Sequence, residues 1–586
     1  MSLGVSKLNF VPTIDPRIDV QKLEKLLYGI ESTATENTYQ VFPIQNFSPS
    51  GLTIVANPPS RNIFVNKKYY LDVTFQIQFN GTSGGAGITL LQAAGLPAAS
   101  GISPGNAYYD APRAYPLSNA MNTVQVSLNG DQVTTNLNQY VRALTRYQND
   151  VKCQDMYESF SPKMLDQFLQ YSDGIGFARS ELRGYGDNPL QCPRGGFIGA
   201  LITRNDSTGA PGDVAIVQLR VIEPIYLSPL GFSCGHQEAS FVQLDTVTEV
   251  VTFGGRGNGP FGGLISSLWS HAIAPVAPAT ITSTNVSVLA ANALFQYMTP
   301  PLDMVIPKSI TYEFTDPIYY STESLSSIAA GQQVQLNLQN VNLTSVPSMM
   351  YLWVSQRDQD NNYTNTDTYF SIENINITFN NRTGLLATAQ ISDLYNITQR
   401  NGCNSNFRQF RRDVGSVMCL KFGEDIALSN LVSAGSRGNY NISAQVLCTN
   451  NYNSSIIPSL SVLFVHTGTY TISNGKCYRE IGLLSENDVL SIKSSSKEPI
   501  QAPEALNALG GIKWSDVVNF FKRAGRTAIN VGKAVAPVVA PQYLPAIETA
   551  DVVAKALGVG RPKGTKKGTM KGGKKLSRAQ MLKMMH

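Results

Sequence analysis

Apolar and polar residues alternate strictly over residues 71–79, the clearest periodic pattern in the chain. One face of this segment is apolar and carries Leu71, Val73, Phe75, Ile77 and Phe79. The opposite face is polar throughout. Because successive side chains of a strand point to opposite faces, this pattern predicts a strand with one face in a core and one face that is polar.

The same period of two predicts further strands on both sides of residue 300. They are expected at residues 39–47, 124–128, 213–227, 240–253, 309–314, 333–338, 370–379, 415–422, 439–449 and 459–472. An Asn129-Gly130 pair after the second of these indicates a tight hairpin turn. In residues 370–379 the pattern shifts at Glu373-Asn374, which indicates a β-bulge. Short strands at this spacing are typical of an all-β sandwich and not of βαβ units.

Helical patterns are short and interrupt the strands. They are predicted at residues 20–28 after Asp19, at 138–147, from Ser161-Pro162 onward, and at 388–399. Two more are predicted near the end of the chain, at 515–535 and 546–557. The fold class is therefore all-β with short helical inserts and a helical or disordered tail.

Pro300-Pro301 separates the two β-rich halves. A strand-like run ends at Tyr297, the two prolines cannot continue a ladder, and a new alternating run starts near Ser309. We therefore predict an N-terminal arm with a short helix at 1–34, β-domains at 35–303 and 304–500, and a tail at 501–586.

Two long segments and one glycine-rich segment are candidates for function. Residues 80–118 and 180–212 are too long for hairpins and are expected to be loops at interfaces. Gly257, Gly259 and Gly262 match the spacing of a dinucleotide-binding loop, but Pro260 lies inside it and only a short apolar run follows. A βαβ unit needs a full helix there, so a glycine-rich loop at the sandwich edge is the better interpretation.

Composition argues against an enzyme or a metalloprotein. The chain has 586 residues, of which 42% are hydrophobic and 15% charged. Its seven cysteines are scattered without a CxxC pair, which indicates free thiols in a reducing compartment. The four histidines are His236, His271, His466 and His586, and none has a catalytic spacing. His466 alternates with apolar residues, so a core or interface position is expected. No secretory signal or membrane-spanning run is expected either.

Positive charge is concentrated at the end of the chain. Residues 501–586 carry 15 Lys/Arg and 4 Asp/Glu, whereas the remaining residues carry 31 and 37. This tail is interpreted as a solvated disordered end, as a segment that neutralises nucleic-acid phosphates, or as a membrane-active helix. The candidate contact residues for nucleic acid or membrane are Lys522, Arg523, Arg526, Lys533, Lys563, Lys566, Lys567, Lys574 and Lys575.

Two diglycines are candidate protease sites, because residues without a Cβ let a narrow cleft grip the backbone. Gly510-Gly511 before Ile512 lies between the β-rich body and the tail. Gly572-Gly573 before Lys574 follows Met570, the hydrophobic residue such sites usually carry. Both resemble the Gly-Gly-X sites cut by adenovirus-type cysteine proteases, which implies release of residues 512–586 if the first is used.

Four stretches resemble the double-jelly-roll major capsid proteins of virophages and Polintons (Mavericks), the mavirus-like type in particular. They are residues 39–79 with Pro58-Pro59, residues 294–301, residues 415–423 and residues 463–470. The resemblance spans about residues 35–490 and rests on patterns of strand and turn. It implies two consecutive eight-stranded jelly rolls and a trimeric, pseudo-hexagonal capsomer in the icosahedral shell of a double-stranded DNA virus.

The resemblance also implies partners and a location. Expected partners are two further copies in a homotrimer, neighbouring capsomers, penton and minor capsid proteins, a viral cysteine protease, and packaged DNA or a membrane. The expected location is the virion shell, after synthesis in the host cytoplasm, with no cofactor. A carbohydrate-binding or adhesive β-sandwich of the fibre or lectin kind is the alternative, and an enzyme on a jelly-roll scaffold is a third. The carbohydrate-binding alternative does not explain the basic tail or the Gly-Gly sites, and scarce histidines and the absence of metal-ligand spacing argue against the enzyme.

Overall fold

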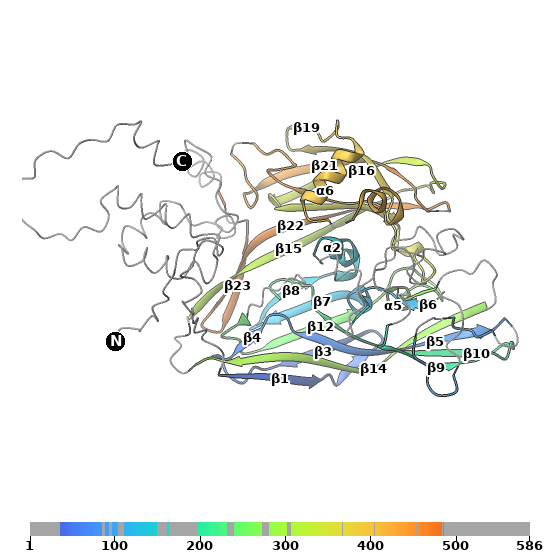
Figure 1. The fold of residues 1–586 in the computed structure, drawn as a ribbon. Helices are drawn as coiled ribbons and strands as arrows, with labels where there is room; N and C mark the ends of the chain where they lie inside the picture. Colours follow the sequence, from blue (N-terminus) through green and yellow to red (C-terminus); the bar gives the residue numbers. More distant parts are fainter. Residues whose placement is uncertain are drawn as a thin grey trace, which may run out of the picture. The chain divides into compact units, whose positions relative to one another are not determined.

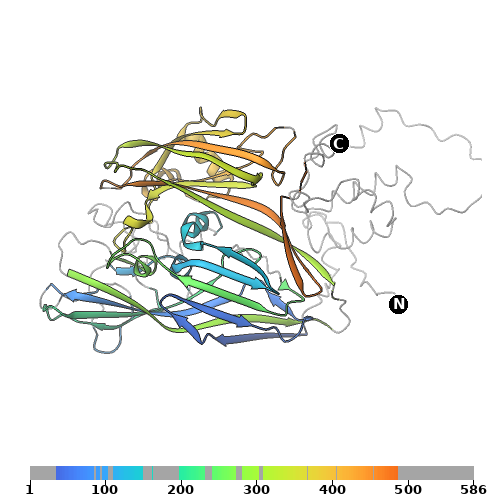
Figure 2. The same cartoon turned by 180° about the vertical axis from the view of Figure 1, so that it is seen from behind.

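A computed structural model describes residues 35–485 of the chain. Gaps lie at 85–87, 93–95, 103–109, 149–160, 163–196, 231–239, 272–279 and 302–305, and at the single positions 307, 366, 404, 430, 453 and 483. Within the described residues, no helix is long and apolar enough to cross a membrane. Figures 1 and 2 show the strands of this part as stacked β-layers.

The first β-sandwich is built from strands between residues 36 and 299. Its larger sheet, here sheet I, has seven strands in the order β11-β4-β14-β5-β10-β9, with β1 paired to β14. Their bounds are β1 Glu36–Pro43, β4 Phe64–Asn66, β5 Tyr70–Thr82, β9 Ala200–Asn205, β10 Asp213–Pro224, β11 Ser240–Phe241 and β14 Thr280–Thr299. The period-two segment of the sequence is β5, at the centre of this sheet.

Sheet II of the first sandwich has five strands in the order β2-β3-β12-β7-β8. They are β2 Asn46–Ser48, β3 Gly51–Ala56, β7 Met121–Leu128, β8 Asp131–Thr135 and β12 Val247–Phe253. Between and beside these strands lie a two-stranded sheet of β6 (Asp110–Pro112) and β13 (Trp269–His271) and four short helical segments. These are α1 (Pro116–Ala120), η2 (Leu137–Gln139), α2 (Val141–Gln148) and α5 (Leu264–Leu268).

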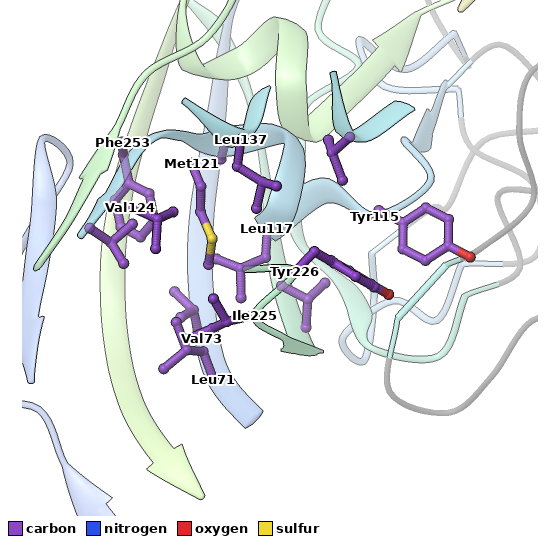
Figure 3. Packing of buried hydrophobic residues seen from close by; sticks show 14 of the residues in the cluster. Leu71, Val73, Tyr115, Leu117, Met121, Val124, Leu137, Ile225, Tyr226 and Phe253 are labelled. Atoms are coloured by element: carbon purple, nitrogen blue, oxygen red, sulfur yellow. The ribbon is translucent and has the colours of Figure 1, made fainter. Parts of the chain in front are cut away.

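The core of the first sandwich fills the space between sheets I and II. The apolar face of β5 is fully buried, and Figure 3 shows Leu71 and Val73 below Met121 and Val124 of β7. Leu117 of helix α1 lies beside them, with Ile225 and Tyr226, which directly follow β10 in the sequence. Burial of each large apolar side chain contributes about 1.5–3 kcal/mol, so this core supplies much of the drive to fold.

The second β-sandwich uses strands between residues 309 and 481. Sheet III has the order β15-β22-β17-β20, with β23 paired to β22, and sheet IV has the order β16-β21-β18-β19. The bounds in sheet III are β15 Ser309–Glu323, β17 Met349–Gln356, β20 Val417–Lys421, β22 Pro458–Ser473 and β23 Lys476–Ile481. In sheet IV they are β16 Gln333–Ser345, β18 Ser371–Phe379, β19 Arg382–Leu385 and β21 Arg437–Thr449. Three helical segments accompany them: η4 Asp358–Asp360, α6 Ile391–Arg400 and the π-helical η5 Gln409–Asp413.

The all-β prediction of two consecutive sandwiches is confirmed, and short strands such as β2 and β11 extend the sheets beyond a simple jelly roll. The predicted bulge is present, because the β18–β21 register shifts between Ile372 and Asn374. The predicted turn after β7 is also present, with positive φ at both Asn129 and Gly130. The helices predicted at 138–147 and 388–399 correspond to η2 with α2 and to α6.

Three predictions about loops and strands were wrong in detail. Residues 180–212 are not all loop, because β9 lies within them and pairs with β10. Residues 80–118 end in β6 and the start of α1, and Leu90 and Leu91 are buried in the core instead of facing outward. The strand predicted at 240–253 is broken into β11 and β12. The helices predicted at 20–28 and after Ser161-Pro162 fall outside the described residues.

Candidate functional site: the junction between the two sandwiches

The two sandwiches share apolar packing along the long strand β22. Leu460, Val462 and Phe464 belong to the core of the second sandwich. Further along the same strand, Tyr470 and Ile472 pack into the core of the first. Phe314 of β15, which is fully buried, joins them there. Because one strand contributes to both cores, the two sandwiches are mechanically coupled.

A buried ion cluster centred on Asp367 links the first sandwich to the loop after β17. Asp367 is 4% exposed, and its Oδ1 accepts from Arg113 Nη1 at 3.3 Å and from Arg142 of α2. Arg113 Nη2 also donates to the backbone oxygens of Asn362 at 3.3 Å and Asn365 at 2.6 Å. Buried charges are costly unless they are paired, so the cluster holds this loop in one position.

Helix α2 adds two more contacts to the same region. Arg146 Nη2 donates to the Asp367 backbone oxygen at 3.1 Å, and its guanidinium lies 4.7 Å from the ring centre of Tyr369. The hydroxyl of Tyr147 donates to the Val417 backbone oxygen in β20, and its ring packs edge-on against Tyr351. Burial raises the pKa of Tyr147, so this hydroxyl stays protonated and remains a donor.

The glycine-rich loop at 254–263 contacts the second sandwich. Gly257 has φ +76°, and a Cβ at this position would overlap the Asn361 backbone oxygen. The Phe261 backbone oxygen accepts from Tyr363 N at 2.9 Å. A helix of only five residues, α5, follows, as the short apolar run predicted. Glycine is needed here because the two backbones approach each other closely.

His271 and Asp110 form a second polar link near this loop. His271 Nδ1 lies 2.7 Å from Asp110 Oδ1, which also accepts from Trp269 Nε1 at 3.2 Å. Burial alone lowers the pKa of His271, but the Asp110 carboxylate raises it above its usual value overall. The His271 amide donates to the Tyr363 backbone oxygen at 2.8 Å. The pair therefore positions β13 against the second sandwich.

A third set of contacts lies at the other end of the junction, around Lys67. Its ammonium is 4.4 Å from the ring centre of Tyr312 and 5.3 Å from that of Phe241. Burial lowers the pKa of Lys67 to about 8, while nearby Glu313 favours the charged form. The Tyr312 hydroxyl accepts from Val242 N at 3.3 Å. Cation–π contacts of this kind contribute about 0.5–2 kcal/mol.

His466, the cysteines and possible metal ligands were the other candidates for chemistry in the described residues. His466 is buried as predicted, bonds Ser345 Oγ through Nδ1 at 2.9 Å, and burial lowers its pKa to about 4. The described cysteines, Cys403, Cys419, Cys448 and Cys477, are free thiols. No cluster of metal-binding side chains was found in the described part of the chain.

All candidate site residues predicted from the sequence lie outside the described residues. These are Gly510, Gly511, Ile512, Gly572, Gly573 and Lys574 for cleavage, and the lysines and arginines between 522 and 575 for nucleic acid or membrane. They stay predictions. The junction residues Arg113, Arg142 and Asp367 were missed, because a single charged residue carries no periodic signal of burial.

Comparison with known proteins places two family models on the chain. The model described as the Sputnik virophage major capsid protein 1st domain matches residues 7–297. The model described as the major capsid protein V20 C-terminal domain matches residues 317–468. The two matches lie on either side of Pro300-Pro301.

Individual relatives agree with these models. The capsid protein V20 of the Sputnik virophage is 26% identical over 559 residues, covering 90% of this chain and 88% of the relative. A solved chain of the Sputnik virophage, from its cryo-EM structure, has a TM-score of 0.72 at 25% identity and covers 86% of this chain and 99% of that chain. The mavirus major capsid protein has a TM-score of 0.64 at 16% identity, covering 85% and 99%.

Proposed function

Because this chain belongs to the double-jelly-roll major capsid proteins of virophages, which form the capsid shell of the virion, we propose that it builds that shell from homotrimeric capsomers of pseudo-hexagonal outline. Each copy would supply two of the six β-sandwiches around the capsomer axis. Three copies in a closed ring need one repeated contact between the first sandwich of one copy and the second sandwich of the next.

The observation that carries this proposal is the fixed pairing of the two sandwiches. Strand β22 enters both cores, and the buried Asp367 binds Arg113 and Arg142 across the junction. A six-fold outline from three chains requires the two sandwiches of one chain to keep one relative orientation. A flexible pair would leave the capsomer edges undefined and would not tile a shell.

Further partners are proposed from the sequence alone. The capsomers would contact one another, penton and minor capsid proteins, and a viral cysteine protease that cuts after Gly511. The basic tail would contact packaged DNA or a membrane inside the shell. Lysines without interleaved aromatic residues favour DNA contacts that are non-specific and sensitive to salt. No catalytic role is proposed, because the family and its fold are structural.

The test is the assembly state of the purified full-length protein. Light scattering on a sizing column is expected to give the mass of three chains, and electron microscopy after concentration is expected to show closed shells. A stable monomer that forms no shells would contradict the proposal and would favour the alternative function of an adhesive β-sandwich protein. Binding of the monomer to a glycan array would then support that alternative.

A further inference from the structure

The outer face of sheet IV carries amides and hydroxyls but almost no charge. Its strands β16 and β21 lie in the layer farthest from the first sandwich (Figures 1 and 2), and β18 pairs with β21 in the same sheet. Residues 324–356, which include β16, contain no Asp, Glu, Lys or Arg, and neither do residues 438–475, which include most of β21. Glu373 of β18 lies at the bulge and accepts from Thr449 Oγ1 at 3.2 Å.

The strand register places the outward amides of sheet IV in two rows. Asn337 lies opposite Gln445, and Gln445 lies opposite Asn376 on the next strand. In the second row Asn342 lies opposite Asn441, whose backbone N donates to Asn380 Oδ1 at 2.8 Å. Directly opposed side chains on one sheet face have Cβ atoms about 5 Å apart, so each row is a continuous strip of amides.

Most of these amides are exposed, and their side chains make few hydrogen bonds within the sheet. Asn337, Asn342, Asn441 and Gln445 are all exposed, while Asn376 is half-buried. Asn376 Nδ2 reaches Gln445 Oε1 only at 3.5 Å, and Asn376 Oδ1 is buried without a hydrogen-bond partner among the described residues. The exposed amides of Asn337, Asn342, Asn441 and Gln445 therefore present donors and acceptors that a partner surface can bind.

The outer face of sheet I offers a contrast. It carries the ion pairs Arg220–Asp72, at 2.7 Å, and Arg204–Asp206, at 2.7 Å. Charged surfaces of this kind keep a protein soluble, and they repel or attract according to their partner. The absence of such pairs from β16 and β21 therefore distinguishes the amide face of sheet IV from the other broad outer face of the molecule.

We propose that the amide face, defined by Asn337, Asn342, Asn376, Asn441 and Gln445, binds the same face of a second copy of this chain in a neighbouring capsomer. Every amide both donates and accepts, so two identical faces are complementary to each other without any charge to neutralise. A contact across a two-fold axis uses one patch twice and must be self-complementary. Like-charged faces would repel in that arrangement, whereas amide strips do not.

This inference rests on the proposed function and names the surface that joins capsomers. The three-fold contact inside a capsomer joins two different surfaces and does not need self-complementarity. The amide face is therefore assigned to the contact between capsomers, and trimer formation is expected to proceed without it. This separation makes the inference testable independently of the capsomer itself.

The experiment uses two full-length double variants of opposite charge. One carries Asn337→Glu and Asn342→Glu, and the other carries Asn337→Lys and Asn342→Lys. Each variant is expected to keep the solution mass and melting temperature of the unaltered protein, since both positions are exposed. Each alone is expected to need about tenfold more protein, or more, to form shells, because like charges meet across the contact.

Mixing the two variants decides the question. A one-to-one mixture is expected to form shells at a lower concentration than either variant alone, because opposite charges then face each other. If each variant assembles like the unaltered protein, or if the mixture stays as defective as its parts, the amide face does not pair with itself. An unaltered protein that forms no shells would instead contradict the proposed function.

Cross-linking gives a second readout that does not depend on charge. Gln445→Cys places a thiol near the middle of the amide face, and shells of this variant are expected to yield disulfide-linked dimers under oxidation. Asn285→Cys, at an exposed position on β14 of the first sandwich, is the matched control and is expected to stay uncross-linked. Equal yields from the two variants would overturn the assignment.

Discussion

The hydroxyl of Tyr69 donates a 2.8 Å hydrogen bond to Glu249 Oε2 inside the core of the first sandwich. Glu249 is fully buried on β12, where its direct cross-strand neighbours are Ile54 and Val126. Burial raises the pKa of Glu249 to about 8, although the bond from Tyr69 favours the ionised form. A carboxyl group in this position is held as the neutral acid at pH 7.

This burial makes the stability of the first sandwich depend on pH. The folded protein keeps the Glu249 proton up to about pH 8, whereas the unfolded chain loses it near 4.5. Folding therefore takes up one proton between these values, and the free energy of unfolding falls as pH rises, by up to about 1.4 kcal/mol per pH unit. Glu249→Gln is expected to remove this slope, as measured by melting temperature from pH 5 to 8.

Tyr69→Phe is the companion variant for this prediction. It removes the donor that favours the ionised form, so the pKa of Glu249 rises further and the pH-dependent loss extends to higher pH. If the glutamine variant keeps the slope of the unaltered protein, another group is responsible. If its melting temperature drops equally at every pH, Glu249 has a packing role only.

Removal of the Asp367 charge is expected to loosen the junction. Asp367→Asn leaves Arg113 and Arg142 without their shared carboxylate in a buried site, where breaking an ion pair costs about 3 kcal/mol or more. Differential scanning calorimetry is expected to show a lower melting temperature or two separate transitions. Shell formation is expected to fail with it, because the sandwiches lose their fixed orientation.

Asp358→Asn is the matched control for this variant. Asp358 pairs with Arg256 at 3.4 Å in the same loop, but its side chain is 50% exposed. Exposed ion pairs contribute about 0–1 kcal/mol, so this change is expected to leave melting and assembly nearly unaltered. Equal effects of the two substitutions would show that the buried position of Asp367 has no special role.

The sequence predicted strands well where one residue pattern decided the outcome. The alternation in β5 and the shift at Glu373-Asn374 both follow from which side chains face the core. The prediction failed where residues far away in the sequence determine where a strand ends. The strand predicted at 240–253 is broken because Asn129, more than 100 positions earlier, accepts from Asp245 N and Thr246 N and donates to the Gln243 backbone oxygen.

The junction was missed for the same physical reason. Arg113 lies in a proline-rich connection and Asp367 in an Asn/Thr-rich one, and nothing in either segment indicates that they meet. The glycine-rich loop was recognised as a loop, but its role against Asn361 depends on the approach of a second sandwich. Long-range packing of this kind leaves no local pattern in a single sequence.

Proteolytic processing is predicted at Gly511. Mass spectrometry of the protein from mature virions is expected to give a chain that ends at Gly511. The variant Gly511→Val is expected to block the cut, because a protease cleft that fits bare backbone has no room for a branched side chain. A chain that ends at Gly573 would favour the second diglycine, and an intact chain through His586 would exclude both sites.

Gly257 is expected to be the least replaceable glycine of the loop at 254–263. An alanine methyl group there would overlap the backbone oxygen of Asn361, so Gly257→Ala must move either the loop or the second sandwich. Gly259 has a similar positive φ of +85° but no atom within 4 Å of the added Cβ. Gly259→Ala is therefore expected to cost only the backbone strain, about 1 kcal/mol, and Gly257→Ala roughly 2–4 kcal/mol. Melting temperatures of the two variants measure the difference, and equal losses would show that the approach to Asn361 adds nothing to the strain at positive φ.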